Sequence, residues 1–375
     1  MTSSIDSLTF HGRLAIQQRV LPAYRAPFFD ALATVCKGGM SLFAGEVRLQ
    51  EAIKTTTELQ IAHFAPAHNR HILGGPFYIC RQDGFIEWLE DQQPDALIVE
   101  ANPRYINTPK GISWMQQHGR PVLGWGLGAP PITGRLRGIR DRARKRLLFS
   151  LDGIISYSQR GAKEYRTLGL PPDRIFVAYN AASPRPTKPP PKRPPDFQGP
   201  PTVLFVGRLQ ARKQLGNLFK ACTAQPPERK PRVLIIGDGP DRKMFERQAQ
   251  DHFPQAEFLG AKHGAELEEF FALADLFVLP GTGGLAVQQA MSHGLPVIVA
   301  QGDGTQEDLA RPENGWLIPP NDLEALTNTL GEALSDSVRL RRMGAESYRI
   351  TAEEINLDEM VAAFVKSLNQ VSKSP

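Results

Sequence analysis

The chain has 375 residues, a length typical of two domains. Hydrophobic residues make up 41% and charged residues 22%, which excludes collagen, coiled-coil and wholly disordered chains, and no apolar run is long enough to predict a transmembrane helix. The net charge of +5 suits an anionic small molecule or an anionic membrane face, but is too small to indicate nucleic-acid binding.

The cysteines and the first residues of the chain bear on its compartment. Three widely spaced cysteines without a CxxC pair predict neither disulfides nor a zinc site. The first twenty residues lack the basic and apolar segments of a secretory signal. We therefore expect a cytoplasmic protein, in a reducing environment.

The first half of the chain alternates short apolar runs with longer amphipathic stretches. The apolar runs predict strands at Leu14–Ile16, Met40–Phe43, Ala96–Val99, Pro121–Gly124, Gly153–Tyr157 and Arg174–Val177. The amphipathic stretches predict helices at Ala26–Val35, Gly84–Gln92, Ile112–Gln117 and Gly161–Leu168. This alternation is typical of an α/β domain.

A proline-rich stretch divides the chain. Residues 183–201 contain nine prolines, which excludes a helix or a central strand. A disordered loop inside one domain is the alternative, but we interpret the stretch as a stiff linker. The predicted domains are then residues 1–182 and 202–351, with a C-terminal helix over 352–370 that packs back on the first domain.

The second half repeats the alternation more regularly. Strands are predicted at Thr202–Val206, Arg232–Ile236, Glu257–Leu259, Leu276–Leu279 and Pro296–Val299. Helices are predicted at Gln214–Thr223, Asp241–Asp251, Glu266–Leu273, Leu285–His293 and, in the tail, Thr351–Leu368. Short apolar strands separated by helices indicate parallel sheets covered on both faces. We expect two doubly wound, Rossmann-like domains with ligands in a cleft at the carboxyl ends of their strands.

Two turns of the second half carry residues suited to a phosphate ligand. The first predicted strand ends at Gly207 and is followed by Arg208 and Lys213, which can neutralise a diphosphate or simply be solvated. The second ends in a turn with Gly237 and Gly239. This turn resembles a nucleotide-binding turn but lacks the full GxGxxG spacing, so a plain strand-to-helix turn is an equal alternative.

The most informative stretch is a glycine-rich loop that opens a helix. It contains Gly281, Thr282, Gly283 and Gly284, and the predicted helix begins at Leu285. Peptide N–H groups and the positive end of the helix dipole make such a loop a phosphate site. A purely geometric need for glycine is the alternative.

These stretches together resemble a known family. The ordered elements GRL-x3-K, GDGP, FLG, ADLFVLP, GGL…QAMSHGLPV and NGWLIPPND, over about residues 203–335, are similar to the C-terminal half of retaining glycosyltransferases of the GT-B class, family 4. The stretches YRAPFFDALA, GWGLGAPP, DGIISYSQRGAKEY and VAYNAAS are similar to the acceptor-side domain. The resemblance implies the two-domain GT-B fold.

The resemblance also assigns roles. It implies that Gly207, Arg208 and Lys213 hold the donor diphosphate. It also implies that the glycine turn (Gly237, Gly239) and the 281–285 loop (Gly281, Thr282, Gly283, Gly284, Leu285) meet the nucleotide and phosphate. The family usually carries two glutamates, at positions that here are Gly281 and Gln289. Gln289 retains an amide that can bond a ribose, whereas Gly281 has no side chain.

The acceptor side is predicted from fewer residues. Tyr24 and Arg25 open a helix after the first strand, and Trp125 lies in a glycine-rich turn, where it either stacks on a sugar or packs in the core. The segment 135–151 carries six arginines and one lysine against one aspartate. Its apolar residues fall at helical spacing, so it predicts a helix on an anionic membrane, with a solvated charged face as the alternative.

The resulting prediction is a transferase. It moves a sugar from a nucleotide-sugar donor to a glycan or lipid-linked acceptor, in polysaccharide or glycolipid assembly, with retention implied by the family. The sequence contains no Asp-x-Asp motif, so we expect Arg208 and Lys213 to stabilise the leaving diphosphate without a metal or other cofactor. No catalytic nucleophile or base stands out, and no nucleic-acid partner is expected. The alternatives are a sugar-nucleotide epimerase and a catalytically silent homologue that binds a sugar nucleotide or a partner enzyme.

Overall fold

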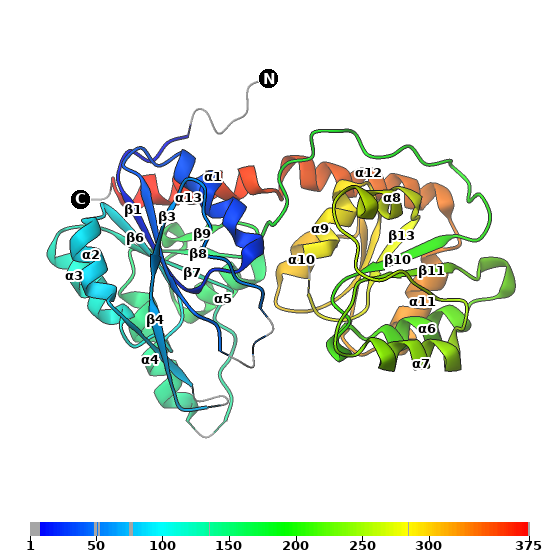
Figure 1. Cartoon of the computed structure of the whole chain (residues 1–375), viewed down its shortest axis with the longest axis horizontal. Coiled ribbons are helices and arrows are strands. Elements are labelled where there is room, and N and C mark those ends of the chain that lie inside the picture. Colours follow the sequence, from blue (N-terminus) through cyan, green and yellow to red (C-terminus); the bar gives the residue numbers. More distant parts are fainter. Residues whose placement is uncertain are drawn as a thin grey trace. The chain divides into compact units, whose positions relative to one another are not determined.

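The computed structural model describes residues 8–48, 51, 53–74, 78–134, 136–283 and 285–373. The chain forms two compact units (Figure 1). Unit 1 comprises residues 1–182 and 357–375, and unit 2 comprises residues 183–356.

Unit 1 is an α/β unit built on a parallel sheet. In its described part, seven strands lie in the order β3-β2-β1-β6-β7-β8-β9. Their bounds are β1 Leu14–Val20, β2 Met40–Gly45, β3 His63–Pro66, β6 Ala96–Glu100, β7 Val122–Gly126, β8 Gly153–Ser156 and β9 Ile175–Val177. The helices are α1 Ala26–Thr34, α2 Phe85–Gln92, α3 Thr108–Gln117, α4 Arg137–Phe149, α5 Gln159–Leu168 and α13 Leu357–Val371. The central strands are buried along their length, as expected where helices cover both faces.

One part of unit 1 was not predicted. Strands β3, β4 (His68–Ile72) and β5 (Ile79–Asp83) fall where the sequence shows no apolar run, and β4 pairs with β5 as an antiparallel hairpin. Side chains of β4 alternate between exposed and half-buried, so the hairpin buries too little apolar surface to leave a periodic signal.

Unit 2 carries a second parallel sheet. Its described residues form six strands in the order β12-β11-β10-β13-β14-β15. Their bounds are β10 Thr202–Val206, β11 Arg232–Ile236, β12 Glu257–Phe258, β13 Leu276–Leu279, β14 Val297–Ala300 and β15 Gly315–Ile318. The helices are α6 Leu215–Thr223, α7 Arg242–His252, α8 Ala265–Leu273, α9 Leu285–Ser292, α10 Thr305–Leu309, α11 Leu323–Ala333 and α12 Ser337–Glu353. Helices α6, α7 and α11 lie on one face of the sheet and α8, α9 and α12 on the other (Figure 1).

The order of the strands in unit 2 is that of a doubly wound nucleotide-binding sheet. Numbered within the unit, it reads 3-2-1-4-5-6, and the direction of winding reverses between β10 and β13. Ligands of such sheets bind at the carboxyl ends of the strands beside this reversal. The loops that follow β10 and β13 therefore define where a site is expected.

The predicted tail helix over Thr351–Leu368 is wrong in its bounds. Helix α12 continues to Glu353, and α13 begins only at Leu357. Asn356, 1% exposed, ends α12 because its amide donates to Thr351 O at 2.9 Å and to Ala352 O at 3.2 Å. Helix α13 belongs to unit 1, where it packs on α1.

The proline-rich segment has neither helix nor strand and belongs to unit 2. The guanidinium of Arg193 attaches it to the carboxyl ends of α8 and α9. It donates to Phe271 O at 2.7 Å, Ala274 O at 2.8 Å and His293 O at 2.9 Å. Burial, with a contribution from the charge of Arg341, lowers the pKa of Arg193 to about 10, so the group remains a cation that complements these helix ends.

Candidate functional site

Two loops meet at the carboxyl ends of β10 and β13, where the winding of the unit 2 sheet reverses. This place is called the switch point below. The loop after β10 contains Gly207 and a short 3-10 turn, η5 (Ala211–Lys213), and the loop after β13 contains the Gly281–Gly283 turn. Thr282 N donates to Arg212 O at 3.1 Å, which joins the two loops through their backbones. The sequence predicted both loops as ligand-binding, and the fold brings them together.

Lys213 is the central side chain of this contact. It is 7% exposed, and its Nζ donates to Thr282 O at 2.7 Å. Burial, and then the nearby charge of Arg212, lowers the pKa of Lys213 to about 8. Among the described residues no carboxylate pairs with it, so its positive charge is held in a poorly hydrated position that favours a nearby anion.

Arg212, which the sequence interpretation did not single out, also reaches the turn. Its Nη1 lies 3.4 Å from both Thr282 O and Thr282 Oγ1. Arg208, the arginine that was predicted, is exposed immediately after Gly207. The loop after β10 thus supplies two guanidinium groups and one buried ammonium group.

The glycines of the turn are required by its packing on this cationic loop. A Cβ at Gly281 would overlap Arg212 O, and a Cβ at Gly283 would overlap Lys213 Nζ. Gly283 also has a φ of +120°, which favours glycine. The absence of a glutamate at position 281 therefore has a local cause, because no side chain fits there. Gly284 lies outside the described residues.

Helix α10 and the loop before it support the same turn. Gln306, on α10, is 2% exposed and donates from Nε2 to Gly283 O at 3.2 Å, while its Oε1 accepts from Asp303 N at 3.1 Å. The carbonyl oxygens of Thr282 and Gly283 are thus both engaged. Because a trans peptide is planar, the N–H of Gly283 points away from Lys213. The signal for Gln306 in the sequence was only a polar loop after a buried strand.

The predicted glycine turn after β11 has a packing role. A Cβ at Gly237 would overlap Gly207 O, and one at Gly239 would overlap Leu209 O. Both glycines therefore allow the loop after β11 to lie against the loop after β10. This close approach fixes the backbone near Arg208.

The remaining predicted residues of unit 2 lie on α9. Leu285 is its first residue and is 40% exposed. Gln289 is half-buried. The preceding Gln288, by contrast, is 2% exposed and donates to Ile355 O at 2.7 Å, so it has a structural role.

In unit 1 the predicted acceptor residues form an aromatic and cationic cluster. Arg25 is 5% exposed, donates to Ala181 O at 3.1 Å and hydrogen bonds Asn180 Oδ1. Its guanidinium lies 5.2 Å from the ring centre of Tyr24 and 5.5 Å from that of Trp125. Tyr24 is 44% exposed and is the member of this cluster that a solute can reach.

Trp125 takes the packing alternative rather than the sugar-stacking one. It is 2% exposed, and its ring stacks on Tyr157 with the centroids 4.9 Å apart and meets Phe364 edge-on at 5.0 Å. Its Nε1 has no hydrogen-bond partner in the part of the chain that the structure describes. A sugar would have to displace these neighbours to stack on the ring.

A second polar cluster, missed in the sequence, lies at the carboxyl ends of β1 and β6. Glu100 Oε1 accepts from Arg19 N at 2.6 Å, and the Arg19 side chain pairs with Glu51 at 2.7 Å. Burial raises the pKa of Glu100, although Arg19 opposes the shift. Isolated polar residues at strand ends gave no motif by which the sequence could reveal this cluster.

The described residues contain no group of three or more His, Cys, Asp or Glu side chains that could hold a metal ion. The same part of the chain has no helix with the length and apolarity needed to cross a bilayer.

The second unit matches a known protein family. Residues 190–350 match the family described as "Glycosyl transferases group 1". This match covers most of unit 2. The family resemblance inferred from the sequence is thereby confirmed for the group 1 domain.

Curated relatives match the same part of the chain. A sulfoquinovosyl transferase of Arabidopsis thaliana is 35% identical over 142 residues, which are 36% of this chain and 27% of that protein. A GDP-mannose-dependent alpha-mannosyltransferase of Mycobacterium tuberculosis is 34% identical over 154 residues, 40% of this chain and 38% of that protein. The chain thus spans about a quarter to two fifths of these relatives.

Solved structures match over nearly the whole chain. A sucrose-phosphate synthase from Thermosynechococcus elongatus has a TM-score of 0.69 at 18% identity, covering 96% of this chain and 99% of that one. Anabaena HepE in complex with UDP has a TM-score of 0.68 at 16% identity, covering 95% and 99%. At this identity the likeness concerns the fold, and the predicted GT-B fold of two Rossmann-like units is confirmed.

Proposed function

We propose that the chain is a glycosyltransferase that transfers a sugar from a nucleotide-sugar donor, and that its group 1 domain binds the donor diphosphate. The observation that carries the proposal is the contact between Lys213 and the Gly281–Gly283 turn at the switch point of unit 2. Arg208, Arg212, Leu285 and Gln289 complete the proposed donor site. The structures of HepE with UDP and with UDP-glucose support a nucleotide-sugar donor.

The chemistry requires that the leaving diphosphate be stabilised as its charge develops. The Lys213 ammonium group is poorly hydrated, so it interacts more strongly with that charge than an exposed lysine would. Helix α9 starts directly after the turn and adds the positive end of its dipole. We propose that this set acts without a metal ion, and that a phosphate oxygen of the donor takes the acceptor proton as transfer proceeds with retention.

For the acceptor we propose a glycan or a lipid-linked molecule. One relative, 30% identical over 159 residues, is named for a phosphatidylinositol monomannoside, and another, 27% identical over 196 residues, for colanic acid biosynthesis. These names support glycolipid or polysaccharide assembly. The cluster around Tyr24 and Arg25 is the proposed acceptor side.

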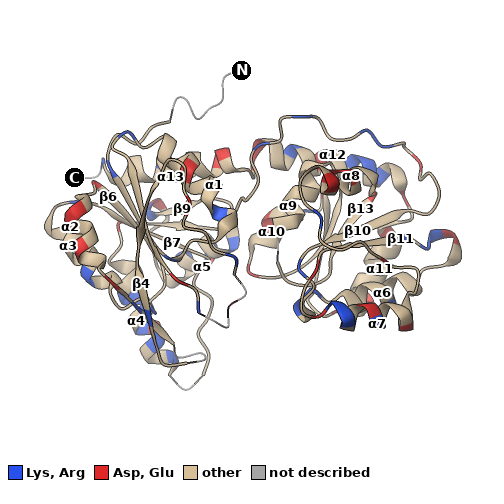
Figure 2. Cartoon of the chain, in the orientation of Figure 1, with Lys and Arg blue, Asp and Glu red and all other residues tan. Residues whose placement is uncertain are grey.

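A lipid-linked acceptor requires contact with a membrane, and α4 is the proposed contact. Basic residues run along this helix (Figure 2). Ile139 is 67% and Leu136 48% exposed, whereas Leu147 and Leu148 are buried and hold the helix to the unit. Arg135 lies outside the described residues. An exposed helix turn that combines cations with apolar side chains suits an anionic membrane surface, and we propose that the protein binds the inner face of the membrane.

A donor screen followed by a turnover assay tests the proposal. UDP-, GDP-, ADP- and TDP-sugars are compared by thermal shift, since a bound donor stabilises the fold by mass action. Transfer to glycan and lipid acceptors is then measured with and without EDTA. Transfer unaffected by EDTA supports the proposal, and EDTA-sensitive transfer overturns its metal-free part. Tight binding without turnover favours a silent homologue, and acceptor-independent change of the sugar favours an epimerase.

A further inference from the structure

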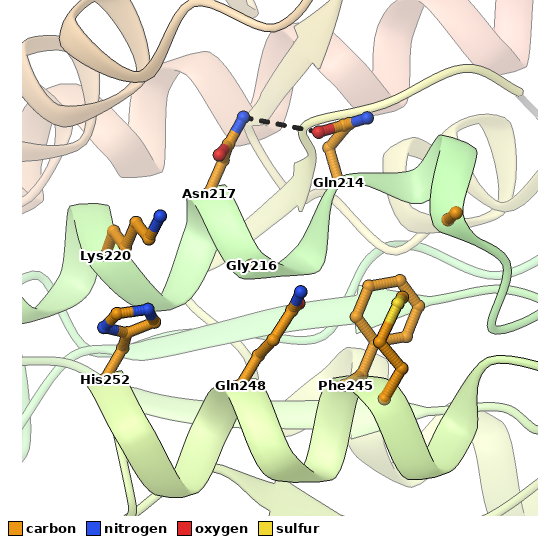
Figure 3. Close-up of a pocket in the computed structure, with 9 residues that line it drawn as sticks. Gln214, Gly216, Asn217, Lys220, Phe245, Gln248 and His252 are labelled. Carbon is orange, nitrogen blue, oxygen red and sulfur yellow. Dashed lines mark hydrogen bonds between the residues drawn. The ribbon is translucent and has the colours of Figure 1, made fainter.

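A cavity separate from the Lys213 turn lies between α6 and α7 of unit 2 (Figure 3). Its volume is about 270 Å³, near the lower end of the ~300–1,000 Å³ of small-molecule sites. The lining residues are Ala211, Gln214, Gly216, Asn217, Lys220, Met244, Phe245, Gln248 and His252. All of them are described, and all lie within unit 2.

One end of the cavity carries a lysine and a histidine. Lys220 of α6 and His252 of α7 face each other across the gap (Figure 3), and both are exposed. No aspartate or glutamate is among the lining residues. A lysine and a histidine without a lining carboxylate favour an anionic group at this end.

The middle of the cavity is lined by side-chain amides. Asn217 Nδ2 lies 3.5 Å from Gln214 Oε1, and Gln248 points from α7 toward Gly216 of α6 (Figure 3). Gln248 Oε1 is buried against Gly216 and has no hydrogen-bond partner among the described residues. The Nε2 of the same amide is not buried in this way and can donate a hydrogen bond to a ligand hydroxyl group.

Gly216 lets the Gln248 amide lie against α6. A Cβ at position 216 would lie 2.6 Å from Gln248 Oε1, so a larger residue would require this flexible side chain to shift. The far end of the cavity is apolar, with the ring of Phe245, which is 1% exposed. The lining therefore passes from cationic through amide to aromatic, the order that a phosphorylated sugar ring would satisfy.

We propose that the cavity between α6 and α7 binds a small phosphorylated sugar, with the phosphate between Lys220 and His252 and a ring hydroxyl on Gln248. The site is distinct from the proposed donor site. Both use the turn η5, however, since Ala211 lines the cavity and Lys213 contacts the Gly281–Gly283 turn. A ligand in the cavity would thus contact the segment that positions Lys213.

Calorimetric titration of the full chain with glucose 6-phosphate tests the proposal, with glucose and inorganic phosphate as the separated halves of the ligand. We expect saturable binding of glucose 6-phosphate that is at least about tenfold tighter than binding of either half. Lys220→Ala and Gln248→Leu should each weaken it about tenfold. The matched control is Lys243→Ala, which removes an exposed lysine of α7 outside the cavity.

A further variant separates this site from the donor site. Lys213→Met should leave the titration unchanged if glucose 6-phosphate binds between α6 and α7, and unfolding temperatures of all variants show whether each is folded. The proposal is overturned by the absence of saturable binding, by equal affinity for inorganic phosphate, or by loss of binding in Lys213→Met but not in Lys220→Ala. None of these results depends on whether the chain transfers sugars.

Discussion

Replacing Lys213 by methionine removes the cation at the switch point while keeping a side chain of similar length. Lys213 Nζ donates to Thr282 O at 2.7 Å and would contribute one charge-assisted hydrogen bond to a bound diphosphate. Such bonds contribute about 1.5–3 kcal/mol, so the Kd of the stabilising nucleoside diphosphate should rise about 10- to 150-fold. The Kd of the corresponding nucleoside should stay nearly constant, because it lacks the phosphates.

Isothermal titration at pH 7, below the pKa of about 8 that burial gives Lys213, keeps the wild-type group charged. Lys243→Met is the control, since it removes one charge from an exposed position on α7. An unchanged diphosphate Kd in Lys213→Met would refute the phosphate role. Equal weakening of nucleoside and diphosphate would refute it as well, because it would indicate a distorted loop rather than a lost charge.

Four further predictions concern stability, the turn, the proline-rich segment and the membrane. The folded-state pKa of Lys213 lies below the ordinary lysine pKa of 10.5. Between these two values the unfolded chain binds more protons, so the free energy of unfolding should rise with pH. The slope is up to about 1.4 kcal/mol per pH unit more than in Lys213→Met, and denaturant titrations showing identical slopes would contradict it. Gly281→Ala places a Cβ on Arg212 O, so it should cost about 1–3 kcal/mol of stability and weaken diphosphate binding. The control Gly138→Ala places its Cβ in open space and should cost no stability. Equal urea midpoints for the two variants would count against the described packing. Arg193→Ala should lower the free energy of unfolding by about 2–4 kcal/mol, because it removes the cation at two helix ends. The control is Lys192→Ala, at the exposed neighbouring position. An equal loss of stability in the two variants would contradict the role of Arg193 in attaching the proline-rich segment. The double variant Ile139→Asp, Arg140→Glu should no longer sediment with anionic vesicles. The control is the double variant Arg229→Glu, Lys230→Glu, at exposed positions of unit 2. If both double variants sediment with the vesicles to the same extent, α4 is not the membrane contact.

The fold could be predicted from the sequence where strands are buried on both faces. Thr202–Val206, Arg232–Ile236 and Leu276–Leu279 have the predicted bounds, because continuous apolar runs between glycine-containing turns have few other interpretations. The hairpin of β4 and β5 could not be predicted, since its exposed faces carry histidine and arginine. The end of α12 depends on the side chain of Asn356, a contact that periodicity does not encode.

The candidate site could be predicted in part. Lys213 and the Gly281–Gly283 turn were found because glycine-rich loops after strands follow a known pattern. Arg212 and Gln306 were missed because their roles depend on loops that meet only in the folded sheet. The burial of Trp125 was equally hidden, since an aromatic residue in a glycine-rich turn fits either a ligand platform or a core.

The central claim is that the diphosphate of a nucleotide sugar binds against the Gly281–Gly283 turn beside Lys213. A crystal structure of the chain with the nucleoside diphosphate that stabilises it most tests this directly. The account predicts a phosphate oxygen within hydrogen-bond distance of Lys213 Nζ and of an amide at the start of α9. A diphosphate bound elsewhere in the molecule, with Lys213 still held only by Thr282 O, would contradict it.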